Sequence, residues 1–106
     1  MPPMDDLLDL ISEEYTLNDI GVQIATETVT KVWARIQSAS RSEFYSAGQS
    51  GLQPSLVAIT PIANYAGQKI AEWRGKRYFI YRTYFATGSD DIELYLEEKV
   101  GVDEGD

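Results

Sequence analysis

The stretch "EWRGKRYFIYRTY", Glu72 to Tyr84, limits what this chain can fold into more than any other part of the sequence. It contains two strand-like runs separated by a tight turn at Gly75 and Lys76, where the glycine supplies the positive φ that short hairpins need. In the second run, large side chains occur at both alternating sets of positions: Tyr78, Ile80, Arg82 and Tyr84, and between them Phe79, Tyr81 and Thr83. We therefore expect a central strand that is covered on both sides.

Further strand patterns lie on either side of this hairpin. "SLVAIT" follows Pro54, and "IELYLEE" shows clean alternation, with Ile92, Leu94 and Leu96 inward and Glu93, Tyr95 and Glu97 outward. The run from Gly21 to Arg35 is rich in β-branched residues, and Thr30, Val32, Ala34 and Ile36 share one face. A change of pattern earlier in this run suggests a turn or bulge near Glu27 and Thr28. The acidic start "DDLLDLISEEYTLND" suits either a helical turn or a strand.

One segment, "RSEFYSAGQSGL" from Arg41 to Leu52, does not follow the strand pattern. Ser38 or Ser40 can cap a short helix, Phe44 and Ala47 are spaced i, i+3, and Gly48 or Gly51 can end it. About two turns long, such a helix needs tertiary or partner contacts to stay ordered. One short helix can hardly bury both Phe44 and Tyr45, so we expect one to pack on the sheet and the other to be free to meet a partner.

Together these patterns predict a mainly β fold. We expect a small antiparallel β-barrel or sandwich of five to six strands, with one short helix or loop excursion near residues 38–54. Residues 1–99 would form this single domain, and residues 100–106 a flexible acidic tail. At 106 residues, a second independent core is not expected.

Composition narrows the classes of function. The chain has no cysteine and no histidine, so it lacks the side chains of disulfides, thiolate sites and the commonest general base and transition-metal ligand. Neighbouring acids such as Asp90 and Asp91 point to opposite faces of a strand and do not converge on a substrate. We expect no enzyme, cofactor or metal. We also expect no membrane association, because no apolar run approaches the ~18–20 residues of a span and the N-terminus is acidic.

Charge is distributed unevenly along the chain. Residues 1–30 hold seven acids and no base, residues 31–82 eight bases and two acids, and residues 83–106 eight acids and one base. These charges can pair between neighbouring strands of one domain, or they can help identical subunits or partner proteins to dock.

The basic and aromatic residues of the hairpin suggest an alternative function. The protein could be a small barrel that binds single-stranded nucleic acid through Arg74, Lys76, Arg77 and Tyr81, although a net charge of −8 opposes it.

Two segments suggest a family. "RSEFYSAGQSGLQPSLV" and "YAGQKIAEWRGKRYFIYRTYFATGSDDIELYLEE" resemble the head-tail joining, or head-closure, proteins of tailed phages and Gram-positive prophages. The resemblance rests on the order and spacing of an "SEFY" helix start, a "GL.P" exit, a "GKRY.I.RTY" strand and a final "IEL" strand. It covers residues 29–98 well and the first 28 residues loosely, and the acidic ends depart from the family pattern.

The resemblance implies a ring-forming stopper or adaptor in the virion neck, assembled in the bacterial cytoplasm after DNA packaging. Its partners would be copies of itself, the portal or adaptor proteins of the head, and a tail-terminator or other tail-side neck protein. Genomic DNA would pass nearby without specific binding. By the same resemblance, the excursion faces the ring channel or a neighbouring subunit through Arg41, Glu43, Phe44, Tyr45, Gly51 and Leu52.

Overall fold

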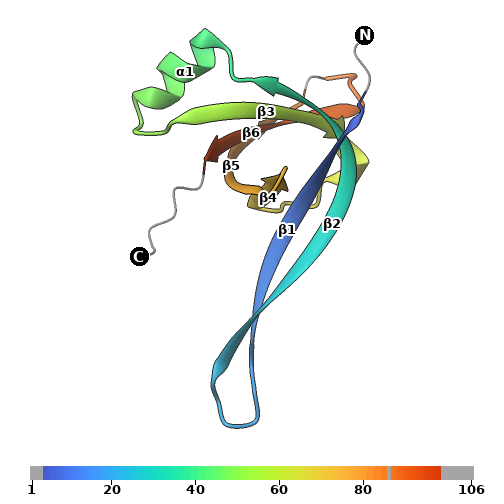
Figure 1. Cartoon of the computed structure of the whole chain (residues 1–106), viewed down its shortest axis with the longest axis vertical. Helices are drawn as coiled ribbons and strands as arrows, with labels where there is room; N and C mark the ends of the chain where they lie inside the picture. Colours follow the sequence, from blue (N-terminus) through green and yellow to red (C-terminus); the bar gives the residue numbers. More distant parts are fainter. Residues whose placement is uncertain (1–3, 86, 99–106) are drawn as a thin grey trace.

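The structure is a computed structural model that describes residues 4–85 and 87–98, and six antiparallel strands dominate it (Figure 1). The strands are β1 (Asp6–Leu17), β2 (Gln23–Ser38), β3 (Pro54–Pro61), β4 (Ile70–Trp73), β5 (Lys76–Tyr84) and β6 (Asp91–Glu98). Helix α1 (Arg41–Gly48) joins β2 to β3, and a single 3₁₀ turn, η1 (Ile62–Asn64), follows β3. The strands pair in the order β1-β2-β3-β6-β5-β4, and β4 pairs with β1 to close the ring. The expected fold class, mainly β with one short helical excursion, is confirmed.

The hydrophobic core fills the inside of this ring. Strand β6 shows the expected alternation, because Ile92, Leu94 and Leu96 are buried and belong to one core cluster with buried residues of every other strand. The expectation that β5 is covered on both sides is wrong: Tyr78 and Ile80 are buried, but Phe79 on the outer face is 41% exposed. A closed sheet has one interior, so each strand can bury only one of its faces there.

The β4–β5 hairpin turns through Arg74 and Gly75, one residue earlier than expected. Both residues have positive φ, 52° and 79°, and Trp73 pairs with Lys76 across the turn. Positive φ at both central positions defines the turn type whose twist matches that of the flanking strands. Arg74, which is not a residue type that usually adopts this conformation, lies with its guanidinium carbon 4.5 Å from the centre of the Trp73 ring.

Gly75 offers a test of this turn. Gly75→Ala should lower the free energy of unfolding by about 1 kcal/mol, because φ is 79° and a side chain there is strained although no atom crowds it. Gly48→Ala is the matched control: Gly48 ends α1 without a positive φ and its site is also open, so alanine should stabilise slightly. Urea denaturation of both variants measures the difference, and equal effects would contradict this description of the turn.

The β1–β2 hairpin extends well beyond the ring. β1 and β2 pair without interruption from Asp6 and Ala34 to Leu17 and Gln23, whereas β1 meets β4 only at Asp9–Ile11 and β2 meets β3 only at Arg35–Ser38. Residues 12–28 therefore form a two-stranded projection, here called the arm (Figure 1). The ambiguous acidic start is a strand, and the turn or bulge expected near Glu27 and Thr28 is absent from this ladder.

A compact turn closes the arm. The Asn18 side-chain oxygen accepts hydrogen bonds from the backbone N–H groups of Ile20 (3.0 Å) and Val22 (2.9 Å). The Asn18 N–H donates to the Val22 carbonyl at 2.9 Å, and Gly21 has a φ of 81°. Asparagine and glycine are the residue types that make such a turn without strain, so the end of the arm has a defined shape. The expected tail, residues 100–106, lies outside the described residues.

Candidate functional site

Helix α1 is held by caps at both ends. The Ser40 hydroxyl accepts a hydrogen bond from the Glu43 N–H at 3.1 Å, and the Leu52 N–H donates to the Ala47 carbonyl at 3.1 Å after the turn at Gly51, whose φ is 83°. The segment singled out by the sequence is thus an ordered helix and exit turn. The predicted site residues in this segment differ in exposure: Arg41, Phe44, Tyr45 and Gly51 are exposed, Leu52 is half-buried and Glu43 is buried.

A buried carboxylate attaches α1 to the sheet. Glu43 is only 8% exposed; it accepts a hydrogen bond from the Tyr81 hydroxyl and two from the Arg82 guanidinium, the longer of them 3.2 Å. Tyr81 and Arg82 are consecutive in β5, and neighbours in a regular strand point to opposite faces. The pairing of β5 with β6 shifts between Ile80 and Arg82, and this bulge lets both side chains reach the same carboxylate.

The surroundings shift the pKa values of this cluster. Hydrogen bonds from Arg82 lower the pKa of Glu43 more than burial raises it, so the carboxylate is charged at neutral pH. Burial and the hydrogen bond to Glu43 raise the pKa of Tyr81 above its usual range. Tyr95 lies 3.8 Å below the Arg82 guanidinium carbon, and burial followed by its hydrogen bond to Glu93 raises its pKa to about 12. The cluster is a fixed ion pair with neutral tyrosines around it.

The outer face of α1 carries two exposed aromatic rings. Phe44 and Tyr45 are 56% and 68% exposed, and they contact each other edge to face with ring centres 6.5 Å apart. The expectation that one of them packs on the sheet is wrong, because Glu43 and Ala47 occupy the buried side of the helix. Beside the rings is an open hollow of about 540 Å³, the α1 hollow, lined by Ala39, Ser40, Arg41, Phe44 and Tyr45.

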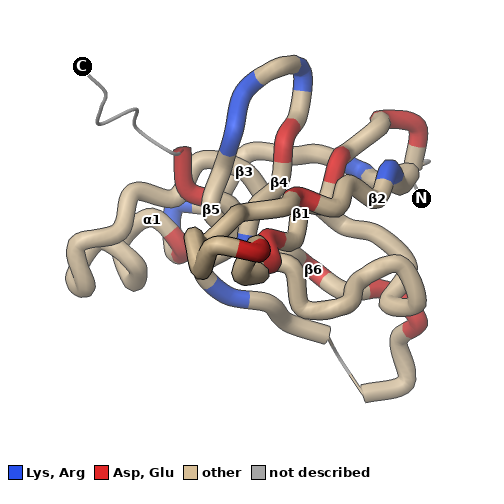
Figure 2. Tube along the Cα trace, turned by 90° about the horizontal axis from the view of Figure 1, so that it is seen from below, with Lys and Arg blue, Asp and Glu red and all other residues tan. Residues whose placement is uncertain are grey.

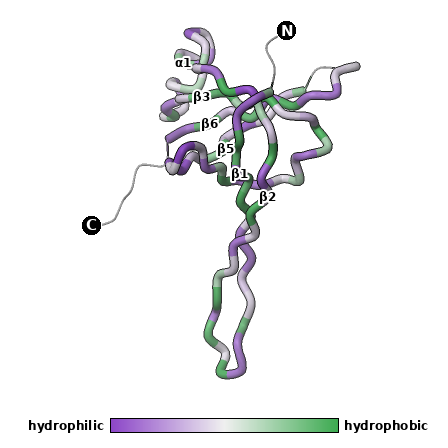
Figure 3. The backbone as a smooth tube through the Cα atoms, turned by 45° about the vertical axis from the view of Figure 1, so that its right-hand side comes forward, coloured by the Kyte–Doolittle hydropathy of each residue, from purple (hydrophilic) through white to green (hydrophobic). Residues whose placement is uncertain are grey.

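The far end of the arm is a second exposed apolar surface. Residues 17–22, here called the arm tip, include Leu17 at 72%, Ile20 at 81% and Val22 at 51% exposure. Figure 3 shows these hydrophobic segments at the end of the projection, away from the ring. No binding role was predicted for this part of the chain from its sequence. Its one signal is the presence of large apolar residues in a stretch with many acids and no bases.

Several ion pairs join the basic middle of the sequence to its acidic ends. Four ion pairs do so: Lys31–Asp9, Arg74–Asp6, Lys76–Glu98 and Arg77–Glu27. Blue and red segments accordingly lie near one another around the sheet in Figure 2. The predicted nucleic-acid residues are therefore engaged: Arg74, Lys76 and Arg77 each face a carboxylate, and Tyr81 contacts Glu43. This arrangement does not favour phosphate binding.

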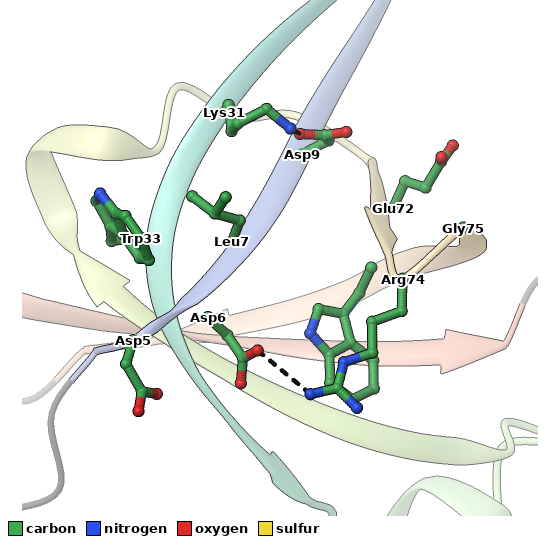
Figure 4. A pocket seen from close by; sticks show the side chains of 10 residues that line it. Asp5, Asp6, Leu7, Asp9, Lys31, Trp33, Glu72, Arg74 and Gly75 are labelled. Atoms are coloured by element: carbon green, nitrogen blue, oxygen red, sulfur yellow. Dashed lines mark hydrogen bonds and ion pairs between the residues drawn. The ribbon is translucent and has the colours of Figure 1, made fainter.

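A second hollow, of about 500 Å³, lies between the start of β1, the facing part of β2 and the β4–β5 turn (Figure 4). Trp33 and Leu7 pair across β1 and β2 on its wall, and both are exposed. Arg74 approaches Asp6 to 3.6 Å and Lys31 approaches Asp9 to 2.8 Å, so charged pairs occupy much of its rim. The hollow is lined by an exposed tryptophan and by charged side chains that form ion pairs with one another. Its lining residues do not form a cluster of reactive groups.

Within the described residues, no group of three acidic side chains is placed to hold a metal ion, and no helix is long and apolar enough to cross a membrane. No model of a known protein family matches the chain, and no curated protein matches it in sequence. The candidate sites are therefore two exposed apolar surfaces, the arm tip and the α1 hollow.

Proposed function

We propose that this chain is a structural virion protein that joins a phage head to its tail, acting by assembly as a ring-forming stopper or adaptor. The observation that carries the proposal is the arm tip, where three large apolar side chains project from the closed sheet with no cover from the described chain. Apolar surface of this kind, held on an ordered turn, is typical of contacts between proteins. That the assembly is a ring between head and tail is inferred from the resemblance of the sequence motifs to head-closure proteins.

The α1 surface supports the same proposal. The buried Glu43 cluster fixes the helix on the sheet, so Phe44 and Tyr45 are presented on a rigid support. Exposed aromatic side chains with few rotatable bonds are the residues that most often dominate the binding energy of an interface. In the proposed neck, the head-side partner is a portal or adaptor protein and the tail-side partner a terminator or other neck protein.

The acidic surface fits the passage of DNA through such a ring. The arm carries Glu13, Glu14, Asp19 and Glu27 and no base, and a negatively charged lining repels phosphates instead of holding them. The genome would then slide past the protein without specific binding. The protein would reside in the virion neck, after assembly in the host cytoplasm.

Complementation tests the role of the aromatic pair. A phage that lacks the chain is supplied with it from a plasmid, either unchanged or with Phe44→Ala and Tyr45→Ala. We expect the double variant to fold, because both side chains are exposed, and to lower the yield of tailed particles by about tenfold or more, as the loss of interface anchors implies. The matched control is Phe79→Ala, which removes an exposed aromatic from the outer face of the sheet. Normal yields from a folded double variant would show that α1 does not contact a neck partner.

A further inference from the structure

We propose that the arm tip of one copy of this chain docks in the α1 hollow of the next copy, so that the subunits join head to tail. This inference rests on the proposed function and deepens it, because it names the surfaces that would build the ring. The α1 hollow would be occupied by a second copy of the same chain, and three properties of the two surfaces support this choice.

The first property is that both surfaces are apolar and exposed in the single chain. Leu17, Ile20 and Val22 project from the tip, and the rings of Phe44 and Tyr45 border the hollow. A projecting apolar turn and an open hollow lined by aromatic rings are complementary in shape as well as in polarity. Contact between them would remove both from water.

The second property is charge complementarity. Asp19 is the one charged residue among residues 17–22 of the tip, and Arg41 is the one charged residue lining the hollow. Within residues 4–85 and 87–98, neither side chain has an ion-pair partner, whereas most of the other cations are paired. Each surface therefore presents a single unpaired charge of opposite sign in an apolar setting, which favours one pairing of surfaces over others.

The third property is where the two surfaces lie. The arm tip and α1 lie toward opposite ends of the molecule, whose longest dimension is 52 Å (Figure 1). The tip of a chain cannot reach its own hollow, so the contact must form between molecules. Two different surfaces in contact make a head-to-tail interface, which leads to a closed ring when the rotation between subunits is suitable.

Hydrogen bonds also hold the arm in a defined shape at both its tip and its base. Its turn is fixed by the Asn18 side chain, and its base is tied to the ring by Arg77, which donates two hydrogen bonds to Glu27, of 2.8 and 3.0 Å, and one to Glu72. A two-stranded hairpin alone is marginal in water, so this attachment matters. An arm that is ordered before binding loses less conformational entropy when it docks.

Charge reversal tests the interface with purified protein. Asp19→Arg gives a chain whose tip and hollow are both positive, and Arg41→Asp gives one in which both are negative. The matched controls, Glu14→Arg and Lys69→Asp, make the same changes of charge at exposed positions outside the two surfaces. Sedimentation is followed up to about 1 mM protein, a concentration that also populates weak complexes.

We expect the wild type and both controls to form species larger than dimers as the concentration rises. Each reversed variant alone should associate about tenfold or more weakly, and a one-to-one mixture of the two should recover the large species with equal amounts of each chain. A monomeric wild type at the highest concentration, reversed variants that associate like the wild type, or a mixture that stays monomeric would each overturn the inference. Particle assembly is scored separately, so failure of this interface is distinguishable from failure of the neck role.

Discussion

Replacing Leu94 by alanine lowers the free energy of unfolding by about 2–5 kcal/mol. Leu94 is fully buried in β6, at the centre of the core inside the closed sheet. Alanine removes most of its apolar contacts and leaves a cavity that the paired strands on both sides, β3 and β5, can fill only partly. Urea denaturation monitored by circular dichroism measures the loss.

The control for Leu94→Ala is Ile20→Ala at the arm tip. Ile20 is also a large aliphatic residue, but it is mostly exposed, so its loss should change the free energy of unfolding by no more than about 0.5 kcal/mol. A protein whose apolar tip contributes little to its own stability has that surface available for a partner. If Ile20→Ala cost as much as Leu94→Ala, the tip would be packed in the free subunit, and both the proposed function and the inferred interface would lose their support.

Removing the carboxylate of Glu43 has the second large effect. Glu43→Ala leaves the Tyr81 hydroxyl and the Arg82 guanidinium without their acceptor beneath α1. The expected loss is about 1–3 kcal/mol, less than for a fully buried pair because Arg82 is partly exposed to water. Arg41→Ala, which removes an exposed charge from the same helix, serves as the control and should have little effect on stability.

The lowered pKa of Glu43 adds a pH dependence to this prediction. The folded state holds the proton less tightly than the unfolded state, whose pKa is near the ordinary 4.5, so the stabilisation is complete above that pH. It is lost as the pH falls through the lower pKa of the folded state. We expect wild-type stability to fall more steeply than that of Glu43→Gln between about pH 5 and 3, and equal slopes would show that the cluster contributes nothing through ionisation.

Local patterns in the sequence predicted much of the fold. The alternation of Ile92, Leu94 and Leu96 identified the buried face of β6, because a side-chain period of two is fixed by strand geometry. The serine cap and glycine exit predicted the short helix α1, and of the alternatives left open Ser40 is the cap and the helix ends at Gly48. The β4–β5 turn was misplaced by one position, since Arg74 adopts a positive φ that its residue type does not indicate.

The candidate sites were less predictable, for a physical reason. Apolar residues such as Leu17 and Ile24 have the same pattern in a core strand and in a projecting arm, and only the extent of pairing with a third strand distinguishes the two. In the same way, the bulge that turns Tyr81 and Arg82 toward one carboxylate leaves no local sequence signal. Sequence periodicity shows which side chains share a face, but it does not show what covers that face.

The central claim is the role in head-tail joining, and electron microscopy of particles from a phage or prophage with a stop codon early in this gene tests it most directly. We predict heads that leak DNA or lack tails, beside free tails, and restoration of tailed particles when the wild-type chain is supplied from a plasmid. Normal tailed and infectious particles in the absence of the chain would contradict the claim.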